Sequence, residues 1–181
     1  CRATRSAGCT PAEGGYTTGH MLHLIPKSLH RLVLRIAHRI RHRWRGVSGR
    51  TGEGVSVIAS DLDGRILLVR HSYGPPNWYF PGGGRRRNEP AETAARRELR
   101  EETGCEIAAL ASVGEIEEEL SNAPHRAHLF AGVVDAVPKV DGREVVEARF
   151  FPVHSLPEPL SPRTRTRLAL WQDWRSRASQ R

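Results

Sequence analysis

The sequence predicts a single α/β domain, because strand-like and helix-like patterns both occur in it. Several short apolar runs are bounded by turn residues, as strands are. Segment 90–103 is rich in Ala, Arg, Glu and Leu, which favour a helix. Pro90 suits its first position, Asn88 or Glu89 its cap, and Gly104 its end. The chain has 181 residues, 38% of them hydrophobic, which suits one domain with appendages.

Residues 1–20 are expected to lie outside this domain as a disordered or non-native segment. They are short of large apolar side chains and rich in Gly, Thr and Ala. The chain begins with Cys1 rather than Met, and Met21 could be the natural start. Cys1 and Cys9 lie here, so the domain has only Cys105, and no CxxC pair occurs. A disulfide framework or a zinc site is therefore not expected, and a cytoplasmic location is.

Residues 21–50 are expected to form a basic amphipathic helical arm that ends in a linker. Large apolar residues recur in it at helical spacing: Leu29, Leu32, Val33, Ile36, Ile40 and Trp44. The arm contains eight Lys and Arg residues and no acidic residue. The whole chain has 28 basic and 20 acidic residues, a formal net charge of +8. Outside the arm, the chain is therefore close to neutral.

Four roles for the arm remain open. Its apolar stripe can pack on the domain or on a second subunit, which would make a homodimer. A basic helix with Trp44 near its end also suits peripheral membrane contact through residues 27–45. The same arginines suit nucleic-acid phosphates, and the acid-free composition suits a transit peptide. Charges interrupt every apolar run, so no membrane span is expected.

The domain itself is expected to cover 51–160, and a glycine-rich linker over 46–54 leads into it. Two strands joined by a tight turn are predicted at 55–59 and 66–69. A short strand over 77–80 then leads to three consecutive glycines.

Three carboxylates dominate the helix that follows these glycines. Glu98, Glu101 and Glu102 fall at i, i+3 and i+4, so they project from one helical face. Like charges at this spacing repel, so the face is either simply solvated or neutralised by a divalent cation. The glycines let the backbone approach a ligand closely, so a carbonyl could join the shell of a metal ion.

These residues are similar to the Nudix box. The residues in its spacing are Gly83, Glu89, Arg97, Glu98, Leu99, Glu101, Glu102, Gly104 and Cys105. The family usually has an aliphatic residue where this chain has Cys105, and many members have Gly where it has Asn88. The resemblance covers about residues 52–160, and it implies the Nudix fold, a mixed β-sheet packed between helices.

The resemblance also implies a metal-dependent hydrolase that cleaves the diphosphate link of a nucleoside diphosphate derivative. Glu98, Glu101 and Glu102 would bind Mg2+ or Mn2+, with the Gly82 carbonyl as a further ligand. Arg97 would orient a carboxylate by charge-assisted hydrogen bonds, and Glu89 is expected to serve the architecture of the loop. Metal ions would neutralise the diphosphate and activate a water that attacks phosphorus.

The remaining elements follow the box. One or two strands are predicted over 105–120, a long strand over 126–137 and another over 144–152. A closing helix over 163–177 is expected within the C-terminal helix and tail, 161–181.

Another carboxylate is expected to complete the site. The family often has an acidic residue near the strand that here ends in Phe151-Pro152, so Glu144 is the first choice and Glu147 the second. One of Glu115, Glu117 and Glu119, which share a side of a strand, could also reach the metal.

Candidate substrate contacts lie around the box. Tyr73 and Trp78 could stack on a base, and Arg85, with its two neighbouring arginines, could meet a phosphate. Arg70 and His71 end a strand, and for His71 a solvent-facing position is favoured over a phosphate contact.

Two alternatives to the small-nucleotide hydrolase remain open. One is a non-catalytic Nudix-like domain that binds a nucleotide for regulation. The intact carboxylates argue against it, because a binder has no need of a hydrolytic cluster. The other is a pyrophosphohydrolase of RNA 5′ ends, with the basic arm holding the transcript. Which nucleoside derivative is cleaved does not follow from the sequence.

Overall fold

The domain is built from five strands and two helices. The structure, a computed structural model, describes residues 52–120, 123–140 and 142–180; the N-terminal segment and basic arm lie outside these ranges. The elements are β1 (Gly52–Ser60), β2 (Ile66–His71), α2 (Ala91–Thr103), β3 (Ala111–Glu119), β4 (Pro124–Val133), β5 (Val145–Phe151) and α3 (Pro162–Ala178).

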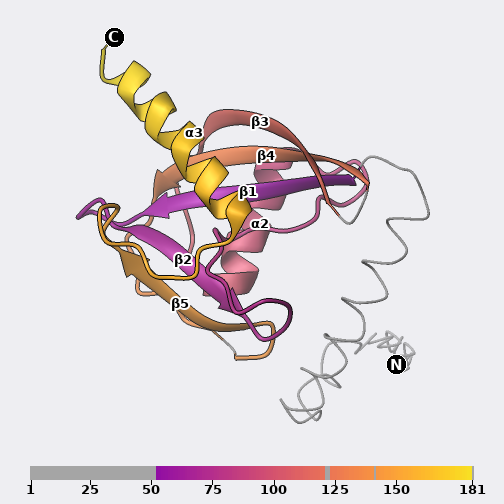
Figure 1. Cartoon of the computed structure of the whole chain (residues 1–181), viewed down its shortest axis with the longest axis horizontal. Helices are drawn as coiled ribbons and strands as arrows, with labels where there is room; N and C mark the ends of the chain where they lie inside the picture. Colours follow the sequence, from indigo (N-terminus) through magenta and orange to yellow (C-terminus); the bar gives the residue numbers. More distant parts are fainter. Residues whose placement is uncertain (1–51, 121–122, 141, 181) are drawn as a thin grey trace, which may run out of the picture.

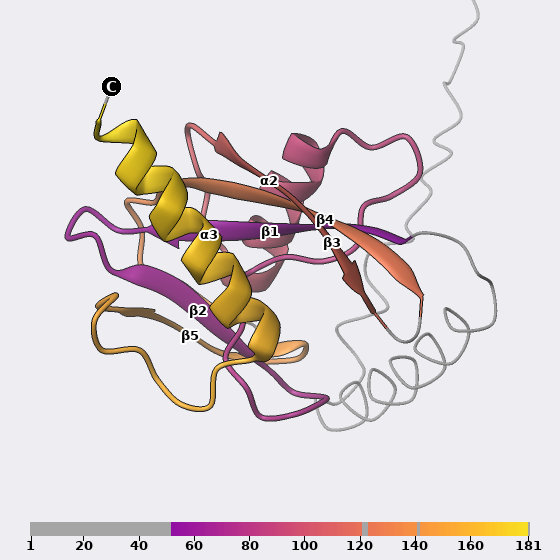
Figure 2. The ribbon, with the colours of Figure 1, turned by 45° about the horizontal axis from the view of Figure 1, so that its top comes forward.

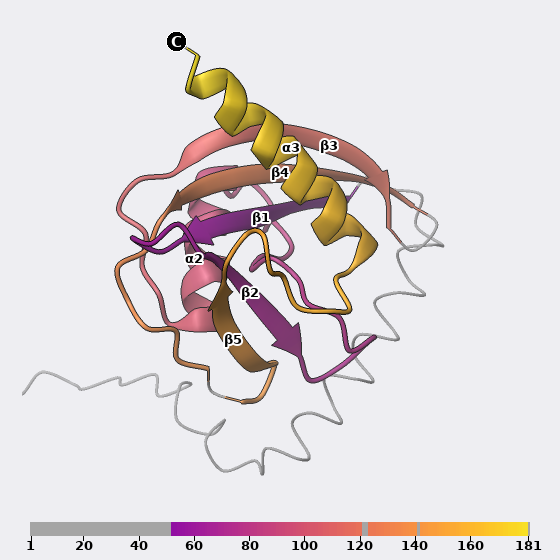
Figure 3. The ribbon, with the colours of Figure 1, turned by 60° about the vertical axis from the view of Figure 1, so that its left-hand side comes forward.

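The strands form one mixed sheet in the order β3-β4-β1-β2-β5. β1 and β4 pair in parallel, whereas the other neighbours pair antiparallel. The predicted mixed α/β sheet is confirmed. Figure 1 shows α3 crossing one face of the sheet and α2 lying behind the other, and the turned views in Figures 2 and 3 agree.

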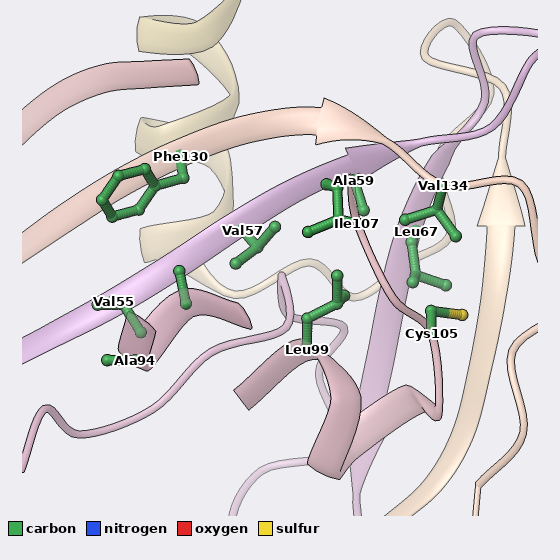
Figure 4. Close-up of a cluster of buried hydrophobic side chains, with 11 residues drawn as sticks. Val55, Val57, Ala59, Leu67, Ala94, Leu99, Cys105, Ile107, Phe130 and Val134 are labelled. Carbon is green, nitrogen blue, oxygen red and sulfur yellow. The ribbon is translucent and has the colours of Figure 1, made fainter. Parts of the chain in front are cut away.

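The face of the sheet toward α2 is entirely apolar at its centre. Val55, Val57 and Ala59 alternate along β1 and pack against Ala94 and Leu99 of α2, with the other side chains drawn in Figure 4. Cys105 is fully buried in this cluster, so the residue that departs from the aliphatic position of the box is a core side chain.

The opposite face of the sheet packs against α3. Ile58, Leu68 and Leu129 of the sheet form one buried cluster with Trp171 of α3, which is 4% exposed. Ser161 caps this helix by accepting a hydrogen bond from the Thr164 N–H. The helix is therefore part of the packed domain.

Several element boundaries differ from the prediction. β1 begins at Gly52, inside the predicted linker, because Gly52 to Gly54 pair with β4. α2 begins one residue after Pro90, with no side-chain cap, and ends at Gly104 in the left-handed conformation that favours glycine. β4 ends at Val133, four residues before the predicted end. No helix of the described residues is long and apolar enough to cross a membrane.

Candidate active site

A cavity of about 370 Å3 opens beside the glycine loop and the start of β1. Four acidic residues line one part of it, Glu98, Glu101, Glu102 and Glu144; they are called the carboxylate cluster below. The first three come from one face of α2, as their spacing predicts. Glu144 directly precedes β5, and the pairing of β5 with β2 brings it to the same cavity.

The glycine loop joins this helix to the sheet. The Val55 N–H donates to the Gly83 carbonyl and the Val57 N–H to the Pro81 carbonyl, so the loop runs beside β1. Gly82, between them, donates its N–H to Glu102 Oε2 at 3.0 Å. A Cβ on Gly83 would lie 2.6 Å from the carboxylate of Glu98. Glycine is needed here because the loop backbone lies directly against the acidic side chains.

The carboxylate cluster carries an unfavourable concentration of charge. Burial raises the pKa of the Glu102 carboxyl well above its usual range, although the hydrogen bond from the Gly82 N–H opposes this shift. The charges of Glu98, Glu144 and Glu101 raise that pKa further. Burial also raises the pKa of Glu98, against the effect of a neighbouring guanidinium. A positive charge in this cavity would therefore be strongly favoured.

Arg97 connects the loop to the cluster. Its guanidinium donates to both carboxylate oxygens of Glu89, at 2.8 and 2.9 Å, and to Glu98 at 2.7 Å. Glu101 lies at 3.3 Å. The hydrogen bonds from Arg97 lower the pKa of Glu89 to about 2. As the sequence indicated, Glu89 serves the loop, where it also accepts the N–H of Arg86.

A tyrosine and a histidine lie beside the carboxylate cluster in the same cavity. Tyr73 donates its hydroxyl to Glu144 Oε1 at 2.5 Å and stacks on His71, with ring centroids 5.3 Å apart. His71 Nε2 lies 3.8 Å from Glu102 Oε1, and its side chain is 14% exposed. The expectation that His71 faces solvent is therefore wrong, because the end of β2 turns it into the cavity.

Three predicted substrate contacts lie elsewhere. Trp78 is buried against Phe151 in the core beneath α3, so it has no free face for a base. Arg70 pairs with Glu147 at 2.6 Å, and neither lines the cavity. Arg85 forms an ion pair with Glu53 of β1 and does not line the cavity either.

The structure also adds a group that the sequence analysis missed. Glu118 of β3, His125 of β4, and Arg163 and Arg167 of α3 line a second part of the same cavity; they are called the arginine cluster below. The acidic residues of β3 were expected to contribute Glu115, Glu117 or Glu119. The one that lines the cavity is Glu118, because alternate residues face opposite sides of a strand. Two arginines four apart in the closing helix were the available signal.

The carboxylate cluster suits a hard divalent cation by donor type and by charge. Carboxylate oxygens are the ligands that Mg2+ and Mn2+ prefer. Within the described ranges, however, no group of three or more His, Cys, Asp or Glu side chains is arranged so that it could hold a metal ion as it stands. Two of the four carboxylates, those of Glu98 and Glu101, form ion pairs with Arg97 instead.

Known proteins share this domain. The model of the NUDIX domain matches residues 50–171. This chain is 54% identical to an RNA pyrophosphohydrolase of Caulobacter vibrioides over 52 residues. The match covers 28% of this chain and 30% of that protein.

Solved structures share the fold. The MutT NUDIX hydrolase of Burkholderia pseudomallei aligns with a TM-score of 0.61 at 25% identity, over 67% of this chain and 98% of that one. The NUDIX domain of Shewanella oneidensis NrtR, solved with ADP ribose, aligns with a TM-score of 0.61 at 16% identity, over 68% and 88%. At that identity the second likeness concerns the fold alone. The match of the family model over most of the chain shows that the protein belongs to the Nudix family.

Proposed function

We propose that this chain is a metal-dependent Nudix hydrolase that cleaves the diphosphate link of a nucleoside diphosphate derivative. One observation carries the proposal: four carboxylates from two separate segments line one cavity beside a glycine loop. Their mutual repulsion is useful to an enzyme that binds a cation, whereas it would only weaken a protein without one.

Each residue of the site has a role in this proposal. Glu98, Glu101 and Glu102 would hold Mg2+ or Mn2+, with the Gly82 carbonyl as a further ligand. A bound cation of this kind neutralises the diphosphate, polarises a phosphoryl oxygen and lowers the pKa of water. Arg97 would keep Glu98 and Glu101 oriented through the ion pairs that it forms with them.

The reaction is a displacement at phosphorus. The oxygen of water forms a bond to one phosphorus as the bridging P–O bond breaks, and the bridging oxygen leaves with the other phosphate. The proton of the attacking water passes to a carboxylate. We assign this role to Glu144, because it comes from a different segment than the three helical carboxylates and is held by Tyr73.

A second candidate substrate is the 5′ end of RNA, which would undergo the same displacement. The curated relatives that match share the name RNA pyrophosphohydrolase, although the first of them is covered over only 30% of its length. The basic arm, with eight Lys and Arg residues, would then hold the transcript. Hydrolysis of RNA should depend strongly on salt, and deleting residues 21–50 should remove that dependence. Salt dependence that survives the deletion would contradict this role for the arm.

The test is a screen of the purified chain against nucleoside diphosphate derivatives, nucleoside triphosphates and 5′-triphosphorylated RNA. Each is incubated with Mg2+ or Mn2+, and the products are weighed by mass spectrometry. Glu102→Gln is the inactive variant. Glu92→Gln is its control, since it removes the same charge from an exposed site on the same helix, where Glu92 pairs with Arg96. Cleavage by wild type and Glu92→Gln, absent in Glu102→Gln, supports the enzyme.

A different outcome would favour the non-catalytic alternative. If no compound is cleaved, but nucleotides still raise the melting temperature of the wild-type protein, the cavity binds without turnover. The hydrolase proposal would then be wrong.

A further inference from the structure

The arginine cluster forms a compact polar group at the edge of the cavity. Arg167 donates to Glu118 Oε1 at 2.7 Å, His125 Nδ1 lies 3.3 Å from the same oxygen, and Arg163 Nε lies 3.6 Å from it. The side chains of Arg167 and Glu118 are 15% and 16% exposed. Burying and ordering these charges costs free energy, which favours a functional reason for the arginine cluster.

The arginine cluster adjoins the glycine loop. A Cβ added to Gly54 would lie 2.9 Å from both the Gly83 carbonyl oxygen and His125 Nε2. Gly83 in turn lies directly against the Glu98 carboxylate. One ligand in this cavity can therefore contact the carboxylate cluster at one end and the arginine cluster at the other.

Several polar atoms of this region lack a partner among the described residues. Ser56 lines the cavity and is 1% exposed, yet its Oγ makes no hydrogen bond, and neither do the buried Nδ1 of His125 and Nε of Arg167. Buried polar groups normally find partners, so this end of the cavity is short of hydrogen bonds.

Glu118 adds an acceptor to these donors. Burial alone would raise its pKa, but the neighbouring His125 and the charges of Arg167 and Arg163 outweigh burial and lower the pKa overall. The carboxylate is therefore ionised and can only accept hydrogen bonds. The hydrogen bond from Arg167 and the short distances to His125 and Arg163 all involve Oε1, so we assign Oε2 to an N–H of the ligand.

We propose that the arginine cluster selects the base of the substrate, and that it selects a 6-oxopurine such as guanine over adenine. This inference rests on the proposed function, because it assigns the base to one end of the cavity and the diphosphate to the other. Guanine presents the acceptors O6 and N7, which match guanidinium donors. Its N1–H and N2 amino group match the acceptor Oε2 of Glu118.

Other ligands fit this arrangement less well. Adenine has an amino group in place of O6 and an unprotonated N1, so it would present a donor to the guanidinium groups and an acceptor to the carboxylate. A buried mismatch of this kind is a strong source of discrimination. A phosphate would match the arginines, but Glu118 would repel it.

The test is calorimetric titration of the full chain with GMP and with AMP, which measures base selection without turnover. Glu118→Gln and Arg167→Met remove the acceptor and the deepest donor. Arg163→Gln is a second donor variant at a more exposed position, where the side chain is 41% exposed. The matched controls are Glu117→Gln on the same strand, where Glu117 pairs with Arg126, and Arg165→Met on the same helix, where Arg165 pairs with Glu158.

We expect wild type and both controls to bind GMP about tenfold or more tighter than AMP. The cluster variants should lose most of that preference while still unfolding cooperatively. Equal affinities for GMP and AMP in wild type, or a preference for AMP, would overturn the inference. So would variants that weaken both nucleotides equally, since that result would make the cluster a phosphate site. GMP selection without hydrolysis of any substrate would instead remove the proposed function and leave this inference standing.

Discussion

The hydroxyl of Tyr73 donates to Glu144 Oε1 at 2.5 Å, and so joins the loop after β2 to the segment before β5. The same tyrosine stacks on His71, which lies 3.8 Å from Glu102. Tyr73 therefore links the carboxylate of a late segment to the side of the cavity that the α2 carboxylates occupy. We assign it a positioning role rather than the base-stacking role that its sequence position suggested.

Replacing Tyr73 with Phe removes this hydrogen bond and keeps the ring. A hydrogen bond to a charged group contributes about 1.5–3 kcal/mol, so we expect kcat to fall about tenfold or more with little change in the melting temperature. Steady-state kinetics of Tyr73→Phe, Glu144→Gln and the double variant measure the effect. If Tyr73 acts through Glu144, the second substitution adds little to Glu144→Gln. Fully additive losses would show that Tyr73 acts independently.

The metal-free protein should be stabilised by Glu102→Gln. The pKa of Glu102 is raised in the folded state, so folding is penalised at every pH above the ordinary pKa of a carboxyl group, and the penalty disappears in acid. We expect the melting temperature of the variant at pH 7 to rise by about 3 °C, the shift for about 1 kcal/mol in a domain of this size. Mn2+ should then stabilise wild type more than the variant. A metal-free variant that melts below wild type would contradict the charge repulsion that we describe.

Glu89 should make the opposite contribution to the pH dependence of stability. Hydrogen bonds from Arg97 lower its pKa from 4.5 to about 2 in the folded state. The stabilisation is therefore present above pH 4.5 and is lost as the pH falls through about 2. Urea unfolding at several pH values should show that loss in wild type, and a weaker pH dependence in Glu89→Gln. If wild type and Glu89→Gln show the same pH dependence, the charge of Glu89 beside Arg97 does not contribute to the free energy of unfolding.

Replacing Gly82 or Gly83 with Ala should have different effects, mainly on stability for Gly82 and mainly on turnover for Gly83. A Cβ on Gly82, where φ is +151°, would collide with the backbone carbonyl of Val55, so Gly82→Ala should reduce the free energy of unfolding by about 2 kcal/mol or more. A Cβ on Gly83 would instead meet the Glu98 carboxylate, so Gly83→Ala should reduce turnover more than stability. Thermal unfolding and kinetics of both variants test this contrast. A Gly83→Ala variant with wild-type turnover would show that displacing the Glu98 carboxylate does not reduce turnover.

The sequence could predict those parts of the site that depend on local spacing. Glu98, Glu101 and Glu102 share a face because a helix repeats every 3.6 residues, whatever surrounds it. The left-handed backbone at Asn88, with φ of +60°, likewise explains why many family members have glycine there and why asparagine is tolerated. Glu144 was found only through the resemblance, since its place depends on the pairing of β2 with β5.

The predictions for Trp78 and for the acidic residues of β3 were wrong because successive residues of an extended segment point to opposite sides, so a shift of one residue changes which side chain reaches the cavity. Trp78 enters the core beneath α3, whereas its neighbour Tyr79 lines the cavity. Glu118 lines the cavity, whereas Glu117 pairs with Arg126 outside it. The register between β3 and β4 also shifts between Ser112 and Gly114, an irregularity that no local sequence pattern predicts.

The most direct test of the account is a Mn2+ titration of hydrolysis, with the substrate found in the screen, for wild type, Glu101→Gln and Glu92→Gln. Both substitutions remove one charge from α2, but only Glu101 lines the cavity. We predict that Glu92→Gln hydrolyses the substrate as wild type does, and that turnover by Glu101→Gln falls by orders of magnitude at every Mn2+ concentration. Wild-type turnover by Glu101→Gln, with the same dependence on Mn2+, would show that the carboxylate cluster is not the catalytic centre.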